Sequence, residues 1–407
     1  MKKIRVLNLT IRIVLFTLIL SVGTMAALVT GETKGLALTD LSGGSVRAMA
    51  SATRNDILYA GLTGGPQPTG IYRSDDNGQT WQVVSSGPGV AINALAVHPA
   101  NDAVLFAGTA GGPAATTDSL WRSDNGGQTW RRFVLSLPAN PYGMIPSVSA
   151  LAVDPHQPGI LYVGTDGQGV YRFDEGRNSY DLMGGVSLYN AHVKGLVVGP
   201  DSRVYALTND GLFVTNGYTW QELEALPELA VSLAVAPNDP QTLYAGGAST
   251  GAYRATDGGR TWERISSGLE MVPGVALRVA ALAVDDQNPN HVVAATAYGI
   301  GSQLARGGIY ESTNAGRNWT KLGNADGVVV SLTINRGVVY AATVNGLARY
   351  GKPAQTAPVV SLPDLRPLAN PTGIQTLILV LTLTLAALAL VGRTEWVAGR
   401  HSPATVS

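Results

Sequence analysis

Short runs of alternating apolar and polar residues recur along the middle of the chain. One recurring phrase is an apolar alternation that ends in a turn, as in residues 95–99 (LAVHP) and 151–155 (LAVDP). A second is a β-rich tetrapeptide, as in residues 58–61 (LYAG), and a third is a strand such as residues 70–74 (GIYRS), which usually runs on into a turn and a Trp-started strand. Such alternation predicts short strands joined by turns.

Each phrase occurs seven times between residues 45 and 350, which gives about 44 residues per repeat, close to the length of a four-stranded propeller blade. The sequence therefore predicts an all-β, seven-bladed β-propeller of four-stranded antiparallel blades over residues 35–350. The seventh repeat lacks a Trp-started fourth strand. We expect residues 36–44 to supply that outer strand and close the ring, which removes a free sheet edge.

Two apolar segments flank the repeats. Residues 13–29 are uncharged and follow Lys2, Lys3 and Arg5, so residues 1–31 are expected to be a signal peptide or a signal anchor. Residues 373–392 carry no charge and are long enough to cross a bilayer as a transmembrane helix. A proline-rich stalk (351–372) precedes this helix, and a short tail (393–407) follows it.

The basic residues that flank both apolar segments predict that the two ends lie in the cytoplasm. The expected location is the cell membrane, with the propeller on the extracytoplasmic side and the membrane itself as one partner.

Composition excludes several classes of function. The 407 residues include 28 basic and 28 acidic side chains and no run of Lys and Arg, so nucleic-acid binding is not expected. The absence of cysteine excludes disulfides and thiolate metal sites. The chain has five histidines in no metal-binding pattern, and two of them, His98 and His156, lie in repeat turns. We expect neither a metal nor a cofactor.

The turn before the fourth strand has the pattern Ser-x-Asp-x-Gly-x-Thr-Trp. Residues 74–81 match it fully, and residues 123–130, 255–262 and 312–319 match it in part. The pattern resembles the Asp-box, or BNR repeat, of sialidases, xyloglucanases, sortilin-type receptors and photosystem II assembly factors. The resemblance implies a hairpin turn between the third and fourth strands, away from the axial binding face.

The residues of this box are expected to be structural, because Asp and Ser accept hydrogen bonds from turn amides and Trp fills space between sheets. They are Ser74, Asp76, Gly78, Thr80, Trp81, Ser123, Gly127, Trp130, Asp257, Gly259, Trp262, Ser312, Gly316 and Trp319. An arginine also recurs on the third strand, at positions 73, 122, 172 and 254. We expect these arginines to pack on aromatic rings and blade edges rather than to form an anion site.

Binding is expected on the opposite side, which we call the loop face. It carries the hairpins between second and third strands and the links between blades, and its longest loops belong to blades 2 and 6 and to the links near Pro141 and Val272. Long loops on a rigid scaffold commonly carry binding residues. The candidates are Tyr142, Met144, Tyr189, His192, Tyr298 and Arg306.

Catalysis would require carboxylates on the same face. The candidates are Asp166, Asp210 and Glu270, since a glycosidase needs two carboxyl groups about 5–9.5 Å apart. Asp166 and Asp210 lie in matching hairpins of adjacent blades, although Asp-Gly sequences also form turns without any catalytic role. The chain has no Arg-Ile-Pro segment of the sialidase type and room for one propeller only.

These features predict a membrane-anchored, non-catalytic binding or assembly scaffold that acts through its loop face. The alternative is a cell-surface glycan-acting hydrolase or glycan-binding module. The partner, a protein or a glycan, is not specified by the sequence.

Overall fold

A computed structural model describes residues 41–52, 55–88, 91–113, 119–133, 137–184, 188–215, 217, 219–223 and 225–351. The chain divides into two units, one made of residues 1–34 and 356–407 and the other of residues 35–355. The expected signal segment, transmembrane helix and tail, and all of the proline-rich stalk after Gly351, lie outside the described residues. Within the described ranges, no helix has the length and apolar character needed to cross a membrane.

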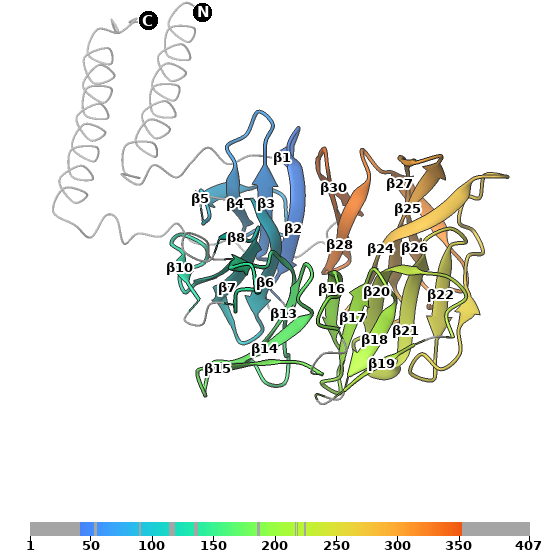
Figure 1. The fold of residues 1–407 in the computed structure, drawn as a ribbon. Helices are drawn as coiled ribbons and strands as arrows, with labels where there is room; N and C mark the ends of the chain where they lie inside the picture. The colour runs from blue at the N-terminus through green and yellow to red at the C-terminus, as the bar shows by residue number, and fades with distance from the viewer. Residues whose placement is uncertain are drawn as a thin grey trace, which may run out of the picture. The chain divides into compact units, whose positions relative to one another are not determined.

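Seven four-stranded antiparallel sheets follow one another along the chain (Figure 1). Blade 1 contains β2 (Ser45–Ser51), β3 (Leu58–Thr63), β4 (Gly70–Ser74) and β5 (Gln82–Ser85). Blade 2 contains β6 (Ile92–His98), β7 (Asn101–Thr109), β9 (Leu120–Ser123) and β10 (Arg131–Arg132). Blade 3 contains β12 (Val148–Val153), β13 (Ile160–Thr165), β14 (Val170–Asp174) and β15 (Ser179–Leu182). Blade 4 contains β16 (Val193–Val198), β17 (Val204–Thr208), β18 (Leu212–Thr215) and β19 (Trp220–Glu222).

Blade 5 contains β20 (Ala230–Ala236), β21 (Asp239–Gly247), β22 (Ala252–Ala255) and β23 (Glu263–Arg264); blade 6 contains β24 (Ala276–Val284), β25 (Val292–Ile300), β26 (Gln303–Ser312) and β27 (Thr320–Asn324). Blade 7 contains β28 (Val329–Asn335), β29 (Val338–Thr343), β30 (Gly346–Tyr350) and β1 (Leu41–Ser42). A small extra sheet pairs β8 (Gly112–Pro113), in the long loop of blade 2, with β11 (Met144–Ile145), in the link to blade 3. The propeller predicted from the repeats is confirmed.

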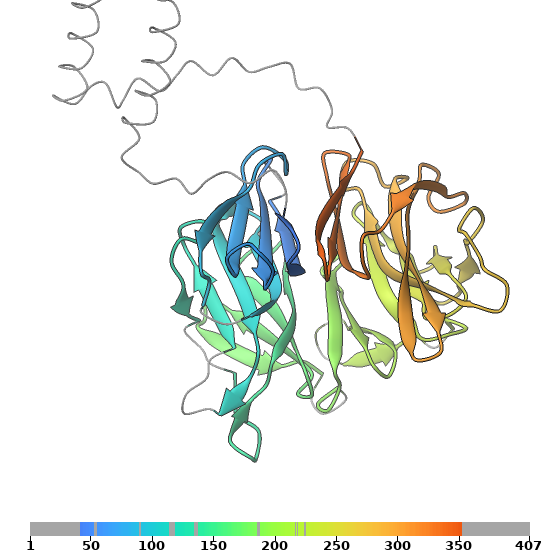
Figure 2. The ribbon, with the colours of Figure 1, turned by 90° about the horizontal axis from the view of Figure 1, so that it is seen from above.

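The first strand of each blade lies innermost, and the first strands of neighbouring blades contact one another around the ring, including β28 with β2. The ring closes where the first and last strands of the propeller meet (Figures 1 and 2). There, β1 pairs antiparallel with β30 as the outer strand of blade 7, and Leu41 lies opposite Leu347. The side chain of Leu41 is fully buried. Of the segment 36–44, only residues 41–44 are described.

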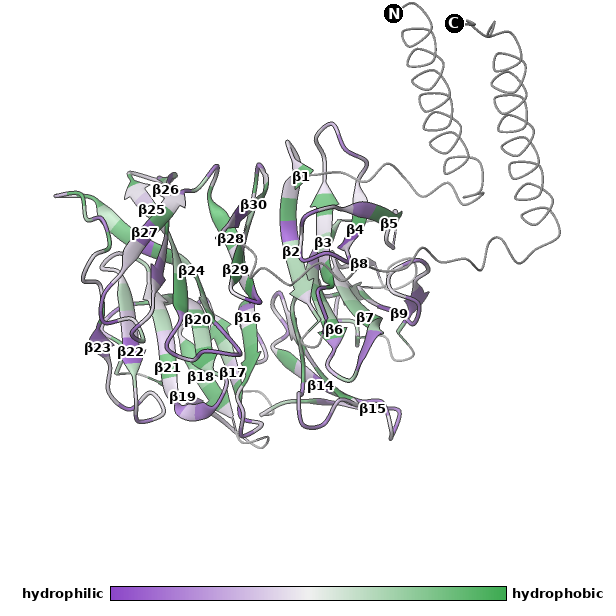
Figure 3. Ribbon diagram, turned by 180° about the vertical axis from the view of Figure 1, so that it is seen from behind, coloured by the Kyte–Doolittle hydropathy of each residue, from purple (hydrophilic) through white to green (hydrophobic). Residues whose placement is uncertain are grey.

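The repeated phrases form the core because each blade packs both of its faces against neighbours. The hydrophobic residues concentrate on the strands, and many connecting turns are hydrophilic (Figure 3). The glycine that ends the tetrapeptide permits this close packing. A Cβ on Gly108 would lie 2.3 Å from a methyl carbon of Val148, and a Cβ on Gly164 would lie 2.6 Å from one of Val193. Each of these valines belongs to the first strand of the next blade.

Candidate functional site

The Asp-box turns are saturated with internal hydrogen bonds. Asp76 accepts hydrogen bonds from the Ser74 hydroxyl (2.8 Å), from the amide N–H groups of Gln79 (3.0 Å) and Thr80 (2.8 Å), and from the Thr80 hydroxyl (2.7 Å). Burial by itself would raise the pKa of Asp76, but these donors outweigh it and lower the pKa. Gly78 has a φ of 70°, which the turn requires.

The partial copies use the same geometry. Asn125 and Asn314, which stand where the pattern has Asp, accept from the hydroxyl of the preceding Ser at 3.0 and 2.9 Å. Asp257 accepts from the Thr261 hydroxyl at 2.6 Å, and this bond is the main reason that the pKa of Asp257 is lowered. The carboxylates at these turns therefore hold backbone in place.

The boxes also connect each blade to the one before it. Trp130 of blade 2 donates its indole N–H to Ser85 of blade 1 (3.2 Å), and Trp319 of blade 6 donates to the Ile265 carbonyl of blade 5 (2.5 Å). In blade 1, the buried Asn77 accepts from Asn335 of blade 7 at 3.0 Å, which ties the first and last blades together. Trp262 differs, since its buried indole N–H has no partner among the described residues.

The recurring arginines stack on aromatic rings of the second strand. Arg73 lies over Tyr59 (5.7 Å from the ring centre), Arg122 over Phe106 (5.5 Å) and Arg254 over Tyr244 (5.9 Å). Arg172 has an ion pair with Asp174 at 3.6 Å instead. These arginines have a packing role, as expected.

On the loop face, the structure brings together two of the predicted residues. The Asp166 carboxylate and His192 Nδ1 form a hydrogen-bonded contact across the junction between the blade 3 hairpin and the link to blade 4. Both side chains are about half exposed, at 55% and 54%. The Asn209 amide donates to the His192 carbonyl (3.2 Å), which joins the next hairpin to this pair.

The turns that contain Asp166 and Asp210 are stabilised by threonines. Thr165 Oγ1 accepts from the Gln168 amide (3.2 Å), and Thr208 Oγ1 accepts from the amides of Asp210 (3.0 Å) and Gly211 (3.2 Å). Because threonine stabilises these turns, the two carboxylates have other surroundings: Asp166 contacts His192, and Asp210 lines a cavity. This differs from the interpretation of both residues as turn formers.

Asp210 lines a cavity of 270 Å³ at the edge between blades 4 and 5. Glu222 and Glu228 contribute two further carboxylates, and leucines 212, 223, 226 and 229 form most of the apolar wall. Glu228 accepts hydrogen bonds from the Ser249 amide (2.6 Å) and from Thr250. Burial would raise the pKa of Glu228, but these donors lower it. Glu228 is therefore ionised and engaged in holding a hairpin of blade 5.

Glu270 is also engaged. It forms an ion pair with Lys321 (2.9 Å), and this hydrogen-bonded contact is the main cause of its lowered pKa. Tyr298 donates to the Glu270 carbonyl (3.1 Å), and burial is the main reason that the pKa of Tyr298 rises to about 12. A carboxylate held in its charged form by a lysine is poorly suited to donate a proton.

The remaining candidates lie apart from one another. Tyr142 and Met144 lie at the β11 turn and are 88% and 40% exposed, and Tyr189 is half-buried beside the blade 3 hairpin. Arg306 lies exposed on β26 of blade 6. The loop face thus contains several separate groups of side chains rather than one central cluster.

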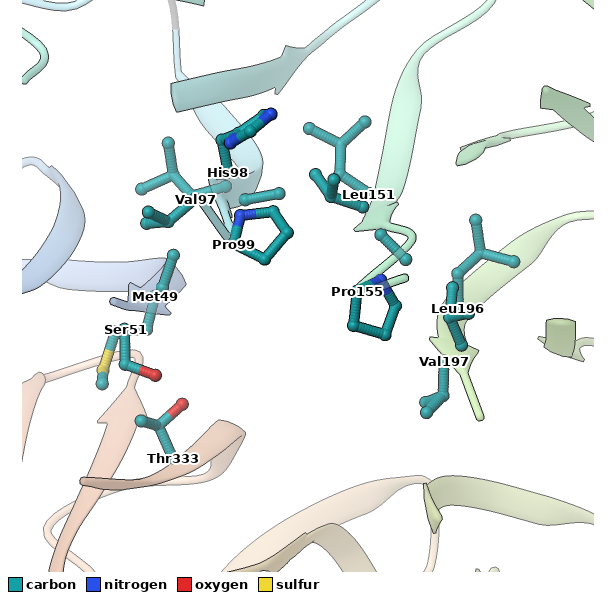
Figure 4. Close-up of a pocket in the computed structure, with 16 residues that line it drawn as sticks. Met49, Ser51, Val97, His98, Pro99, Leu151, Pro155, Leu196, Val197 and Thr333 are labelled. Carbon is teal, nitrogen blue, oxygen red and sulfur yellow. The ribbon is translucent and has the colours of Figure 1, made fainter. Parts of the chain in front are cut away.

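A cavity of 380 Å³ opens on the axis at the opposite, Asp-box end (Figure 4). The ends of the first strands of blades 1, 2, 3, 4 and 7 line it, with His98, Leu151, Leu196 and Thr333 around an open centre. None of the described residues that line it carries a carboxylate. Most of the residues that line the cavity have apolar side chains. The cavity was not predicted from the sequence, although the repeated phrase of residues 95–99 and 151–155 forms part of its wall.

Sequence reasoning also missed Glu222, Glu228, Lys321 and Arg278. Each lies on a strand or link that the repeat pattern treats as variable, so no motif marks them. Their positions follow only from the pairing of strands. Glu222 lies beside Gly211, and Arg278 and Arg306 both lie opposite Ala297.

Comparison with known proteins supports the repeat family and the fold. Residues 72–83 match the BNR/Asp-box repeat. A xyloglucanase of Paenibacillus sp. is 26% identical over 249 residues, which cover 54% of this chain and 20% of that enzyme. The chain thus spans about a fifth of that relative's length.

Solved structures share the propeller. YCF48 bound to D1 peptide has a TM-score of 0.55 at 15% identity, with 78% of this chain and 96% of that chain covered. YCF48 from Cyanidioschyzon merolae has a TM-score of 0.53 at 12% identity, with 76% and 95% covered. An ancestral GH74 enzyme has a TM-score of 0.54 at 19% identity, with 77% of this chain and 45% of that chain covered.

Proposed function

We propose that this seven-bladed BNR/Asp-box propeller is a non-catalytic binding module that holds a segment of another protein on its loop face. The observation that carries the proposal is the state of the candidate carboxylates. Asp166 is paired with His192 and Glu270 with Lys321, while Glu228 holds a hairpin. An acid and a base in the geometry of glycoside hydrolysis need a free pair of carboxyl groups, and two of the three carboxylates predicted from the sequence, Asp166 and Glu270, are already engaged.

Exposed apolar side chains on the same face support binding. Tyr142 is 88% exposed and Met271 54%, and both lie in links between blades. Tyr and Met side chains are enriched in protein interfaces relative to the rest of the protein surface. The likeness to YCF48, whose solved structure holds a D1 peptide, adds support, because this propeller covers nearly all of that single-ring protein.

Site-specific crosslinking tests the proposal. The chain has no cysteine, so one introduced thiol can carry a photo-crosslinker without background. Tyr142→Cys places the probe on the loop face, and Gln79→Cys, in an exposed Asp-box turn, is the matched control. We expect a protein adduct from Tyr142→Cys in intact cells and none from Gln79→Cys. Equal labelling from both positions would contradict a specific loop-face partner.

A glycan-acting enzyme or glycan-binding module is the second candidate. It is favoured by the match to a xyloglucanase and by the cavity that brings Asp210, Glu222 and Glu228 to one site. Incubation with xyloglucan and other polysaccharides, followed by measurement of reducing ends, tests it. Release that disappears in Asp210→Asn and in Glu222→Gln would establish hydrolysis and displace the first proposal.

We also infer that the chain is anchored to a membrane with the propeller on the extracytoplasmic side. The apolar segments 13–29 and 373–392 and the basic residues that flank them support the inference. Protease added to intact cells should degrade residues 45–350, and protection of this region would contradict the inference.

A further inference from the structure

Blade 6 is built from the longest strands of the propeller and carries two arginines in register. β24, β25 and β26 have nine, nine and ten residues. Arg278 on β24 lies opposite Ala297 on β25, and Ala297 lies opposite Arg306 on β26. Residues directly opposite one another share a face of the sheet, so the two arginines lie on one face, roughly 10 Å apart across two strand spacings.

These two guanidinium groups differ from those of Arg73 and Arg122 in their surroundings. Among the described residues, neither forms an ion pair or a side-chain hydrogen bond, whereas Arg73 and Arg122 each pair with a carboxylate. Arg306 is exposed and Arg278 is half-buried, and burial lowers the pKa of Arg278. A partly buried cation without a partner is stabilised when an anion arrives.

Leu304 lies two residues before Arg306 on β26, and blade 7 carries two further exposed apolar side chains, Val330 and Val344. Leu304, Val330 and Val344 are 45%, 44% and 48% exposed. The link between the blades connects them, since the Ala325 amide donates to the Gly307 carbonyl (3.1 Å), next to Arg306, and a Cβ on Gly327 would lie 3.4 Å from Val344. We call Arg278, Leu304, Arg306, Val330 and Val344 the blade 6–7 patch.

We propose that the blade 6–7 patch docks a segment of a partner protein in which an acidic side chain is flanked by apolar ones. This proposal rests on the proposed function and assigns the partner's chemistry. Charge complementarity selects the acidic group, because Arg306 can bind a carboxylate through two parallel hydrogen bonds. The exposed leucine and valines select the apolar neighbours. A sugar is the poorer fit, since the patch contains no aromatic ring to stack against it.

Selection of peptides by the full-length chain in detergent tests the proposal. A phage library of random linear peptides is panned on the protein, and the affinity of the enriched peptides is measured with Arg306→Glu, Arg306→Lys and Leu304→Ser. Arg260→Glu, in an exposed Asp-box turn, is the matched charge-reversal control. Arg306 and Leu304 are exposed, so these variants should retain the fold, which a thermal melt verifies.

We expect the enriched peptides to combine Asp or Glu with apolar residues. Arg306→Glu should weaken their binding by about tenfold or more, with a smaller salt dependence than the parent protein. Arg306→Lys should bind more weakly than the parent but better than Arg306→Glu, because it keeps the charge and loses the two parallel hydrogen bonds. Leu304→Ser should weaken binding, and Arg260→Glu should change nothing. A peptide with Lys in place of its acidic residue should bind Arg306→Glu better than it binds the parent.

Other outcomes separate the two proposals. Enriched peptides that bind Arg306→Glu and Leu304→Ser as well as the parent would overturn the assignment of the patch and leave peptide binding intact. A library that yields no enriched peptide would overturn both. Retention on a polysaccharide column that is lost in Arg306→Glu, without peptide enrichment, would make the patch a glycan subsite and would also overturn the proposal.

Discussion

The two faces of the propeller use the same residue types in opposite ways. On the Asp-box side, Asp76 accepts four hydrogen bonds from its own turn, so its carboxylate is engaged in holding that turn. On the loop face, Thr165 and Thr208 stabilise the turns. The neighbouring Asp166 contacts His192, and Asp210 lines a cavity. The role of an aspartate in such a turn therefore depends on which side chain accepts the hydrogen bonds of the turn amides.

The arginines of the two groups of strands also differ in their surroundings. Arg73 and Arg122, on the third strands, lie on aromatic rings and pair with nearby carboxylates. Arg278 and Arg306, on the lengthened strands of blade 6, have no such partners among the described residues. The comparison predicts that changes on the Asp-box side reduce stability, whereas changes on the loop face reduce binding.

Removal of Trp81 should have the largest effect on stability. This side chain is 1% exposed and packs in the core between blades 1 and 7. Trp81→Ala should lower the free energy of unfolding by about 3–5 kcal/mol, the usual cost of deleting a buried aromatic ring. Trp262→Ala should cost less, because Trp262 is only half-buried and its indole N–H has no partner in the described structure. Urea unfolding of both variants measures the difference.

Leu41 tests the closure of the ring. Its side chain is fully buried in the same core, although its strand has only two residues. Leu41→Ala should cost about 2–5 kcal/mol, less than Trp81→Ala because fewer buried atoms are removed. Leu304→Ala, at an exposed position of the loop face, is the control and should leave the melting temperature nearly unchanged. Equal melting temperatures for the two variants would contradict a structural role of β1.

Periodicity was sufficient to predict the blades, because each strand carries its own alternation and each turn its own glycine. The Asp-box residues were predictable for the same reason, since Ser74 to Trp81 form a local unit with contacts at short sequence separation. The stacking of the recurring arginines followed from the aromatic residue in each tetrapeptide, with Tyr59 beside Arg73 as the example.

The loop face was predictable only in part. Its residues come from separate links and hairpins, so their contacts depend on the packing of neighbouring blades. His192 and Asp166 were both candidates, but their contact across a blade junction follows from no spacing. The pairing of Glu270 with Lys321 connects residues 51 positions apart. The position of Arg278 on the same sheet face as Arg306 could be found only from the register of three strands.

Asp76 should show a smaller, pH-dependent effect. Its folded-state pKa lies below the ordinary value of 3.8, so the stabilisation is present at neutral pH and is lost as the pH falls through the folded-state pKa. Asp76→Ala should lower the free energy of unfolding at pH 7 by about 1–2 kcal/mol through its lost hydrogen bonds. The penalty should shrink in unfolding experiments on the acid side of pH 4 or so. A penalty that does not change with pH would contradict the role of the ionised carboxylate.

The Asp166–His192 pair should have the smallest effect on stability, and it tests the comparison most directly. Both side chains are about half exposed, and an exposed ion pair contributes little, so Asp166→Asn should change the free energy of unfolding by less than about 0.5 kcal/mol. Urea unfolding beside Asp76→Ala makes the measurement. A cost as large as that of Asp76→Ala would mean that the loop-face aspartate is structural after all, and the distinction between the two faces would then rest on the blade 6–7 patch alone. A negligible cost means that Asp166 does not hold its turn, because removing its charge leaves the threonine-stabilised backbone intact.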